Sequence, residues 1–254
     1  MTQKARRRGG AALVLLCGAV ALGAQSPLRV VATNSWTAAF AVAAGASHVV
    51  TLAPTDLRHP AEYELKPSDV EAIKGADLIV YSGFEVMATK LGDAAGRQSI
   101  RMLKIEADYT EAALRASLTA LGDALGSPYI AQANLAALET FLGLWKRDLG
   151  DAGLAGAPIV AHVFQAPLMT ELGFRVVGVF GPGPLEAAQI AKLSPLSAKL
   201  IVDNWHNEAG GPLRETMKSA RYASLINFPG PDGTTSLLDV LADDRARLRA
   251  AAGY

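Results

Sequence analysis

Runs of apolar residues divide the chain into two blocks in which strand patterns alternate with helix patterns. Each of these short runs lacks polar alternation, which is typical of strands buried on both faces of a sheet. The strands predicted in the first block are 28–32, 49–52 and 77–81. Those predicted in the second block are 158–161, 175–179, 200–203 and 224–226. Strands that alternate with helices predict a mostly parallel α/β sheet in each block.

One sustained helical pattern separates the two blocks. Leucine and tryptophan recur three and four residues apart from Tyr129 to Leu149, which produces one continuous apolar stripe. Ser127 and Pro128 suit the cap and first turn of this helix, and Gly150 suits its end. The pattern predicts an α/β fold of two lobes bridged by one long helix. The predicted segments are an N-terminal lobe at 25–126, the bridging helix at 127–150 and a C-terminal lobe at 151–254.

Two shorter helices have recognisable boundaries. In the first block, Ser68 suits an N-cap, and Val70, Ile73 and Ala76 follow at helical spacing. At the end of the chain, residues 237–252 predict a closing helix with alternating charges on one face.

The N-terminus has the pattern of an export signal. A basic start that includes Lys4 and Arg6 precedes an apolar run at 11–23, and small residues surround Ala24. This pattern predicts a signal peptide at 1–24 and a periplasmic mature protein, because the apolar run is short for a membrane span. Cys17 follows leucine where a lipoprotein signal needs a small residue, so we expect no lipid anchor.

Composition narrows the chemistry that the mature chain can carry out. The only cysteine of the sequence lies in the signal segment, so disulfides and thiolate metal sites are excluded from the mature protein. Lysine plus arginine equals aspartate plus glutamate at 24 each. With this balance the chain has no excess of positive charge with which to bind nucleic acid. Metal chemistry in this chain would therefore depend on histidine and carboxylate.

Three of the four histidines follow predicted strands. His59, His162 and His206 each come at or just beyond a strand's carboxyl end, whereas His48 precedes a strand and suits a solvated surface position. Open α/β sheets bind ligands at this edge, and neutral imidazole is the commonest zinc ligand. Taken singly, each histidine is better explained by a structural role: His59 as a loop residue, His162 as a core residue and His206 as a surface residue. Their joint placement predicts a metal site between the lobes.

Several motifs resemble a known family. The segments 62–69 (Glu-Tyr-Glu-Leu-Lys-Pro-Ser-Asp), 76–83 (Ala-Asp-Leu-Ile-Val-Tyr-Ser-Gly), 172–177 and 186–193, together with His162, are similar to the cluster A-I, or ZnuA/TroA-like, metal-binding proteins of ABC importers. The resemblance covers most of the mature chain. It implies two α/β lobes tied by a rigid long helix, with a cation held in the cleft between them.

The chain departs from this family's pattern at the expected ligands. Ala61 occupies the place of the family's first histidine, and His59 stands two residues earlier. The family's Asp-Pro-His segment is absent, and Asn227 stands where a late aspartate is usual. The resemblance carries over His162 directly and His59 with a shift, and placement alone suggests His206 as a replacement. A fourth position is left to water, Glu85, Glu208, Asp232 or Asn227.

The expected function is capture of a divalent transition metal and its delivery to the membrane permease of an ABC transporter. We expect Zn²⁺ as the transported ion, with Mn²⁺ or Fe²⁺ as alternatives, no enzymatic activity, and a monomer. Two other functions remain open on the same fold, an adhesin or a carrier of a metal chelate. A zinc hydrolase is a further alternative, because three histidines with an open position also activate water.

Overall fold

Two parallel four-stranded sheets form the framework of the protein. The computed structural model describes residues 27–96 and 100–254. The first sheet has the order β2-β1-β3-β4, with bounds β1 (Arg29–Ala32), β2 (His48–Thr51), β3 (Leu78–Tyr81) and β4 (Arg101–Lys104). The second has the order β6-β5-β7-β8, with bounds β5 (Pro158–His162), β6 (Arg175–Phe180), β7 (Leu200–Asn204) and β8 (Arg221–Leu225). The predicted signal peptide and Cys17 lie outside the described residues.

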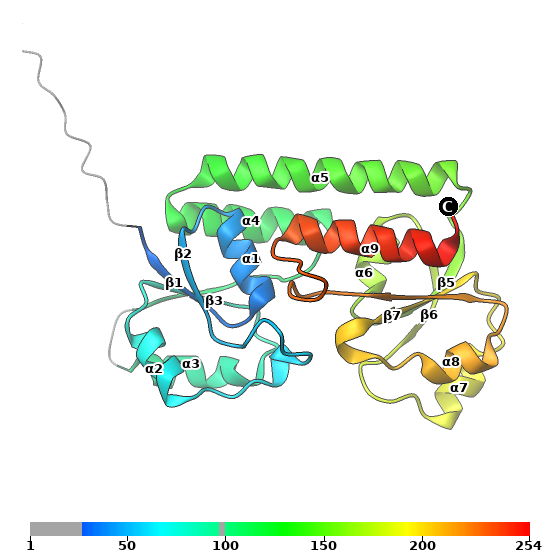
Figure 1. Ribbon diagram of the computed structural model, residues 1–254, viewed down its shortest axis with the longest axis horizontal. Coiled ribbons are helices and arrows are strands. Elements are labelled where there is room, and N and C mark those ends of the chain that lie inside the picture. The colour runs from blue at the N-terminus through cyan, green and yellow to red at the C-terminus, as the bar shows by residue number, and fades with distance from the viewer. Residues whose placement is uncertain (1–26, 97–99) are drawn as a thin grey trace, which may run out of the picture.

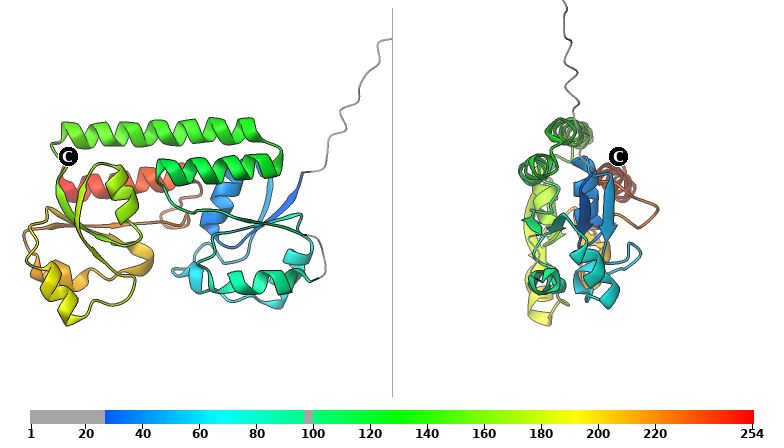
Figure 2. Two further views of the ribbon diagram at one scale, coloured as in Figure 1. Left: turned by 180° about the vertical axis from the view of Figure 1, so that it is seen from behind. Right: turned by 90° about the vertical axis from the view of Figure 1, so that its left-hand side faces the viewer.

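The predicted class, two α/β lobes joined by one long helix, is confirmed. Helix α5 (Pro128–Asp151) runs along both lobes, beside α4 (Glu111–Leu125), as Figures 1 and 2 show. The apolar stripe of α5 is buried, with Leu142, Trp145 and Leu149 fully enclosed. Because this stripe packs into a core shared by both lobes, the helix is a structural spine and not a loose linker.

Helices cover both faces of each sheet. The remaining helices are α1 (Ser35–Ala43), α2 (Pro67–Lys74), α3 (Leu91–Ala95), α6 (Ala166–Glu171), α7 (Ala187–Leu193), α8 (Gly211–Thr216) and α9 (Leu237–Ala252). In the N-terminal lobe, α2 and α3 share an outer core with β1 and β3. In the C-terminal lobe, α7 and α8 share one with β5 and β7. None of the helices in the described parts of the chain is long and apolar enough to cross a membrane.

Three local expectations need correction. The N-cap of α2 is Lys66, and Ser68 lies in the first turn, because Pro67 takes the first helical position that suits its fixed φ. Strand β2 is an edge strand whose residues alternate between exposed and half-buried, so it is not enclosed on both faces. Strand β4, the other edge, was not predicted, because its sequence Arg-Met-Leu-Lys is too short and too charged to stand out.

The last helix ties the lobes together a second time. Helix α9 follows the C-terminal sheet but contacts both α1 and α5. Its start is fixed by Ser236, whose hydroxyl accepts a hydrogen bond from the backbone N–H of Asp239. Between the lobes, the Tyr109 hydroxyl donates to the carbonyl oxygen of Asn227 at 2.9 Å. The two lobes therefore share one core and several direct links.

This construction predicts a small closing motion. Because α5 is continuous and buried against both lobes, we expect the lobes to rotate little when solute binds, with backbone shifts on the order of 1 Å. Small-angle X-ray scattering with and without zinc would measure the change in radius of gyration. A large hinge closure, of the kind seen when flexible strands join two domains, would contradict this expectation.

Candidate functional site

A cleft of about 470 Å³ lies between the two lobes at the carboxyl ends of their strands. The N-terminal lobe contributes Trp36, Arg58, His59, Pro60, Ala61, Glu62, Phe84, Ala107 and Asp108. The C-terminal lobe contributes Val163, Phe164, Pro167, Pro182, Asn204, His206, Asn207, Asn227 and Phe228. This is the edge where parallel α/β sheets bind ligands. The cleft is therefore the candidate binding site.

The structure brings two of the three predicted histidines to this cleft. His59 is exposed in the loop before the 3₁₀ helix η1 (Pro60–Glu62), on the N-terminal lobe. His206 lies in η3 (Trp205–Asn207), on the C-terminal lobe, and is only 5% exposed. The Asn204 side chain creates the turn, because its Oδ1 accepts the backbone N–H groups of His206 and Asn207. His162 ends β5, fully buried, and does not line the cleft.

The hydrogen bonds of His206 set its tautomer. Nδ1 accepts the backbone N–H of Asn227 at 3.4 Å, so in a neutral ring the proton is on Nε2. Metal-bound histidines usually have the opposite arrangement, with the second ring nitrogen donating to an oxygen. In this conformation His206 therefore offers the cleft a hydrogen-bond donor.

His162 has the same tautomer in a tighter setting. Its Nδ1 accepts the backbone N–H of Phe164 at 3.2 Å, and its buried Nε2 has no partner among the described residues. Gly181 closes over the ring, because a Cβ at that position would lie 2.3 Å from Nε2. The ring also packs against Phe164 and Phe180, with centroids 5.0 and 5.5 Å away. Ligation by His162 would require this wall to move.

Burial keeps both of these histidines neutral. Burial lowers the pKa of His206 to about 3, with smaller contributions from the nearby charges of His59, Arg58 and Arg247. Burial also lowers the pKa of His162, and Asp203 opposes this shift. A histidine must be neutral to bind a metal ion. A neutral ring also keeps one nitrogen as an acceptor and the other as a donor.

Two candidates for the fourth position are already engaged in buried networks. Glu85 accepts hydrogen bonds from Thr33 Oγ1, Asn34 Nδ2 and the backbone N–H groups of Ser82 and Gly83, at 2.5–3.0 Å. This carboxylate ties the ends of β1 and β3 together. The side chain of Asn227 is equally committed, because its Oδ1 accepts the amides of Gln165 and Asn204.

The other two candidates form ion pairs at the surface. Glu208 accepts a hydrogen bond from Arg58 at 3.0 Å across the mouth of the cleft. Arg58 also donates to the carbonyl oxygen of Trp205 and lies 5.0 Å from that ring, so it connects the lobes. Asp232 pairs with Arg247, away from the cleft lining.

No group of three or more histidine, cysteine, aspartate or glutamate side chains in the described part of the chain is arranged to hold a metal ion. The three-histidine set therefore stays a prediction. The aromatic residues of the cleft were not among the predicted site residues. Phe84, Phe164 and Phe228 each follow a predicted strand, as the histidines do, and Trp36 lies in the first turn of α1. Aromatic residues just beyond strand ends were the signal that would have revealed this lining.

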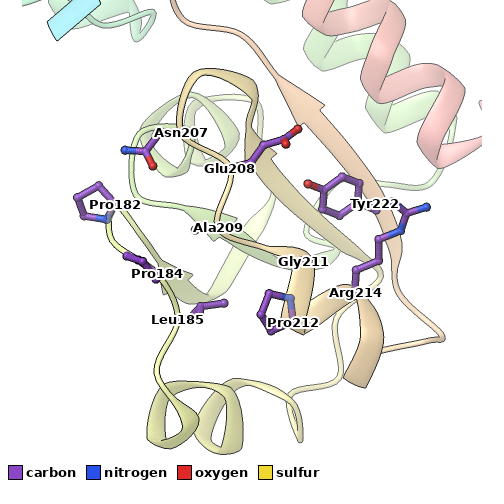
Figure 3. Close-up of a pocket in the computed structure, with 10 residues that line it drawn as sticks. All are labelled: Pro182, Pro184, Leu185, Asn207, Glu208, Ala209, Gly211, Pro212, Arg214 and Tyr222. Carbon is purple, nitrogen blue, oxygen red and sulfur yellow. The ribbon is translucent and has the colours of Figure 1, made fainter. Parts of the chain in front are cut away.

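A second pocket of about 580 Å³ lies beside the cleft on the C-terminal lobe. Figure 3 shows Pro182, Asn207, Glu208, Arg214 and Tyr222 around it. Pro182 and Asn207 also line the cleft, so the two hollows share a wall. The Arg214 guanidinium stacks over the Tyr222 ring at 5.1 Å, which fixes the far side of this pocket.

Comparison with solved structures identifies the class of fold. The chain is similar to the SBP FpvC of Pseudomonas aeruginosa in complex with Ni²⁺, with a TM-score of 0.71, 18% identity and coverage of 90% of this chain and 96% of that one. It is also similar to the laminin-binding protein Lmb of Streptococcus agalactiae, described as having adhesin and metal-transporting activity, with a TM-score of 0.71, 16% identity and coverage of 89% and 99%.

A third similar structure is the periplasmic zinc-binding protein TroA of Treponema pallidum, with a TM-score of 0.65, 18% identity and coverage of 89% and 99%. No family model and no curated protein matches the chain. At these identities the likeness establishes the fold. The resemblance to cluster A-I metal-binding solute-binding proteins of ABC importers, inferred from sequence motifs, is confirmed at that level.

Proposed function

We propose that this chain is an extracytoplasmic solute-binding protein that captures a divalent transition metal between its lobes and delivers it to the permease of an ABC importer. The observation that carries the proposal is the cleft itself, which His59 enters from one lobe and His206 from the other. The similar folds of FpvC, Lmb and TroA, whose names include nickel, metal transport and zinc, support it. Nitrogen ligands favour zinc over manganese.

The proposed ligands are His59, His162 and His206. The His206 ring packs edge to face against Trp205 and Phe228, with both centroids 4.9 Å away. Binding metal through its Nε2 would displace the proton now on that nitrogen, and binding through Nδ1 would displace the Asn227 N–H. Either route costs free energy, so His206 in the conformation described here is poorly suited to bind a bare ion.

A second form of the same function follows from that cost. The metal could arrive as a chelate that brings its own oxygen or nitrogen donors and needs from the protein only hydrogen bonds and apolar contacts. The tautomers of His162 and His206 favour this form, as does the absence of a three-residue ligand cluster from the described residues. No specific arrangement of described residues favours the adhesin or hydrolase alternatives, and we do not propose them.

Alanine replacement of the predicted ligands separates the two forms. If the protein binds bare zinc through histidine, His59→Ala, His162→Ala and His206→Ala should each lower zinc affinity by at least about tenfold, because even partners that touch only a ligand have effects of this size. Isothermal titration calorimetry at neutral pH would measure these affinities, with metal content of the purified protein as a second readout.

His48→Ala is the matched control, because His48 is exposed at the start of β2 and does not line the cleft. It should leave zinc affinity unchanged. If all three ligand variants bind zinc as the wild type does, histidine ligation is wrong. Failure of zinc to bind at all, alone or chelated, would remove the metal-carrier function.

A further inference from the structure

We propose that the solute of the cleft is a metal complex whose chelating group is a planar aromatic ring bearing an oxygen donor, such as a phenolate or catecholate. This inference rests on the chelate form of the proposed function. Three features of the cleft support it: its aromatic walls, the Nε2–H that His206 offers to a solute, and a volume far larger than an ion.

Aromatic rings line the cleft from both lobes. Trp36 and Phe228 are nearly buried and touch edge to face, with centroids 5.3 Å apart. Phe84 and Phe164 stand on opposite lobes and are 49% and 47% exposed. Phe84 continues the cluster, because its ring meets Phe228 edge to face at 6.2 Å. Half-exposed rings next to buried ones form a surface onto which another flat ring can stack.

His206 supplies a polar anchor within this apolar lining. The residue is 5% exposed and lines the cleft. Its Nδ1 is occupied by the Asn227 N–H, so its Nε2 carries a proton. Among the described residues, no acceptor is hydrogen-bonded to that N–H. This nitrogen is not one of the enclosed unpartnered atoms of the described residues, so solvent reaches it, and a solute oxygen can replace water as the acceptor of its proton.

Size separates the complex from a bare ion. The cleft encloses about 470 Å³, within the range of roughly 300–1,000 Å³ that is usual for organic ligands. A metal ion with three or four protein ligands needs no such space. A ring that stacks between Phe84 and Phe164, with an oxygen near His206, would fill this volume and leave the metal coordinated by the chelator.

The test compares four probes, three of which contain zinc, on the purified mature protein. The probes are zinc alone, the zinc complex of hydroxyquinoline sulfonate, the same chelator without zinc, and zinc nitrilotriacetate, which is aliphatic. Tryptophan fluorescence would report binding, because Trp36 lines the cleft, and gel filtration would show whether metal and chelator stay bound together. We expect the aromatic complex to bind at least tenfold more tightly than zinc nitrilotriacetate and to elute with the protein.

Variants connect this preference to the rings. Phe164→Ala and Phe84→Ala should each lower affinity for the aromatic complex about fivefold to tenfold, whereas Phe164→Leu, which keeps most of the apolar bulk, should lose less. Tyr129→Ala is the matched control, because Tyr129 is 86% exposed on α5 and does not line the cleft. His206→Phe should weaken the aromatic complex by removing the donor.

The outcomes distinguish this inference from the proposed function. If zinc nitrilotriacetate binds as tightly as the aromatic complex and Phe84→Ala and Phe164→Ala bind normally, the aromatic solute is wrong. In that case, tight binding of zinc alone that depends on His206 would leave the metal carrier intact. If no zinc species binds, the inference and the proposed function both fail.

Discussion

Metal-free protein should lose folding free energy steeply as the pH falls from 6 to 4, and His206 should account for much of the loss. Burial lowers the pKa of His206 to about 3 in the folded protein, against about 6.5 in an unfolded chain. Between these values the unfolded chain binds a proton that the folded protein refuses, so stability is full above pH 6.5 and declines below it. At about 1.4 kcal/mol per pH unit, the cost at pH 4 is on the order of 3 kcal/mol.

Urea unfolding at several pH values, with a chelator present to remove metal, would measure this dependence. His206→Gln should flatten the slope between pH 6 and 4, because glutamine has no proton to gain and its carbonyl can still accept the Asn227 N–H. Part of the slope should remain, because burial lowers the pKa of His162 as well. His48→Gln is the control and should keep the wild-type slope. An unchanged slope in His206→Gln would show that His206 is solvated in solution.

Asp244→Asn should stabilise the protein at neutral pH, because the amide keeps the oxygen that accepts the Ile226 N–H and has no proton to lose inside the core. Asp244 is fully buried in α9, and burial raises its pKa well above the usual range despite a hydrogen bond from the Ile226 N–H. Asp243 adds to the shift and Arg247 opposes it. Its Oδ2 has no partner among the described residues. Because the folded pKa is raised, wild-type stability falls as pH rises above the unfolded value, near 3.9.

Urea unfolding at pH 7 and pH 4 would test this expectation, and the difference between Asp244→Asn and wild type should vanish at pH 4. Asp239→Asn, in the first turn of the same helix, is a control of opposite sign. Hydrogen bonds from Thr235, led by its backbone N–H, lower the pKa of Asp239, so losing this charge should destabilise the protein at neutral pH. A loss of stability in Asp244→Asn at pH 7 would mean that the carboxylate is charged and paired.

A frame of buried hydrogen bonds lies behind the cleft. The side-chain oxygens of Glu85, Asn227 and Asp203 each accept hydrogen bonds from residues of their own lobe. The residues left to meet a solute include His59, His206, Glu62, Asp108 and the aromatic rings. Recognition would then depend on a few groups held in place before the solute arrives, which reduces the entropy cost of binding.

The sequence alone determined the fold class and most of the elements. Short apolar runs such as 158–161 and 200–203 correspond to β5 and β7, the central strands of the second sheet. Central strands need apolar residues on both faces. The three- and four-residue spacing of leucines identified α5, and the predicted closing helix matches α9. The same pattern does not identify edge strands. Strand β4 is mostly exposed, so its residues carry little of the apolar signal on which strand prediction depends.

The sequence also placed three histidines at strand ends but did not determine what their ring nitrogens do. That depended on contacts between residues far apart in the chain. The Asn227 N–H occupies Nδ1 of His206 from 21 positions away, and Gly181 closes over His162. Likewise, Phe84 and Phe164 face one cleft only because α5 and α9 hold the two lobes together. Tautomer, burial and cleft lining arise from packing across the lobes, and no local pattern of residues encodes them.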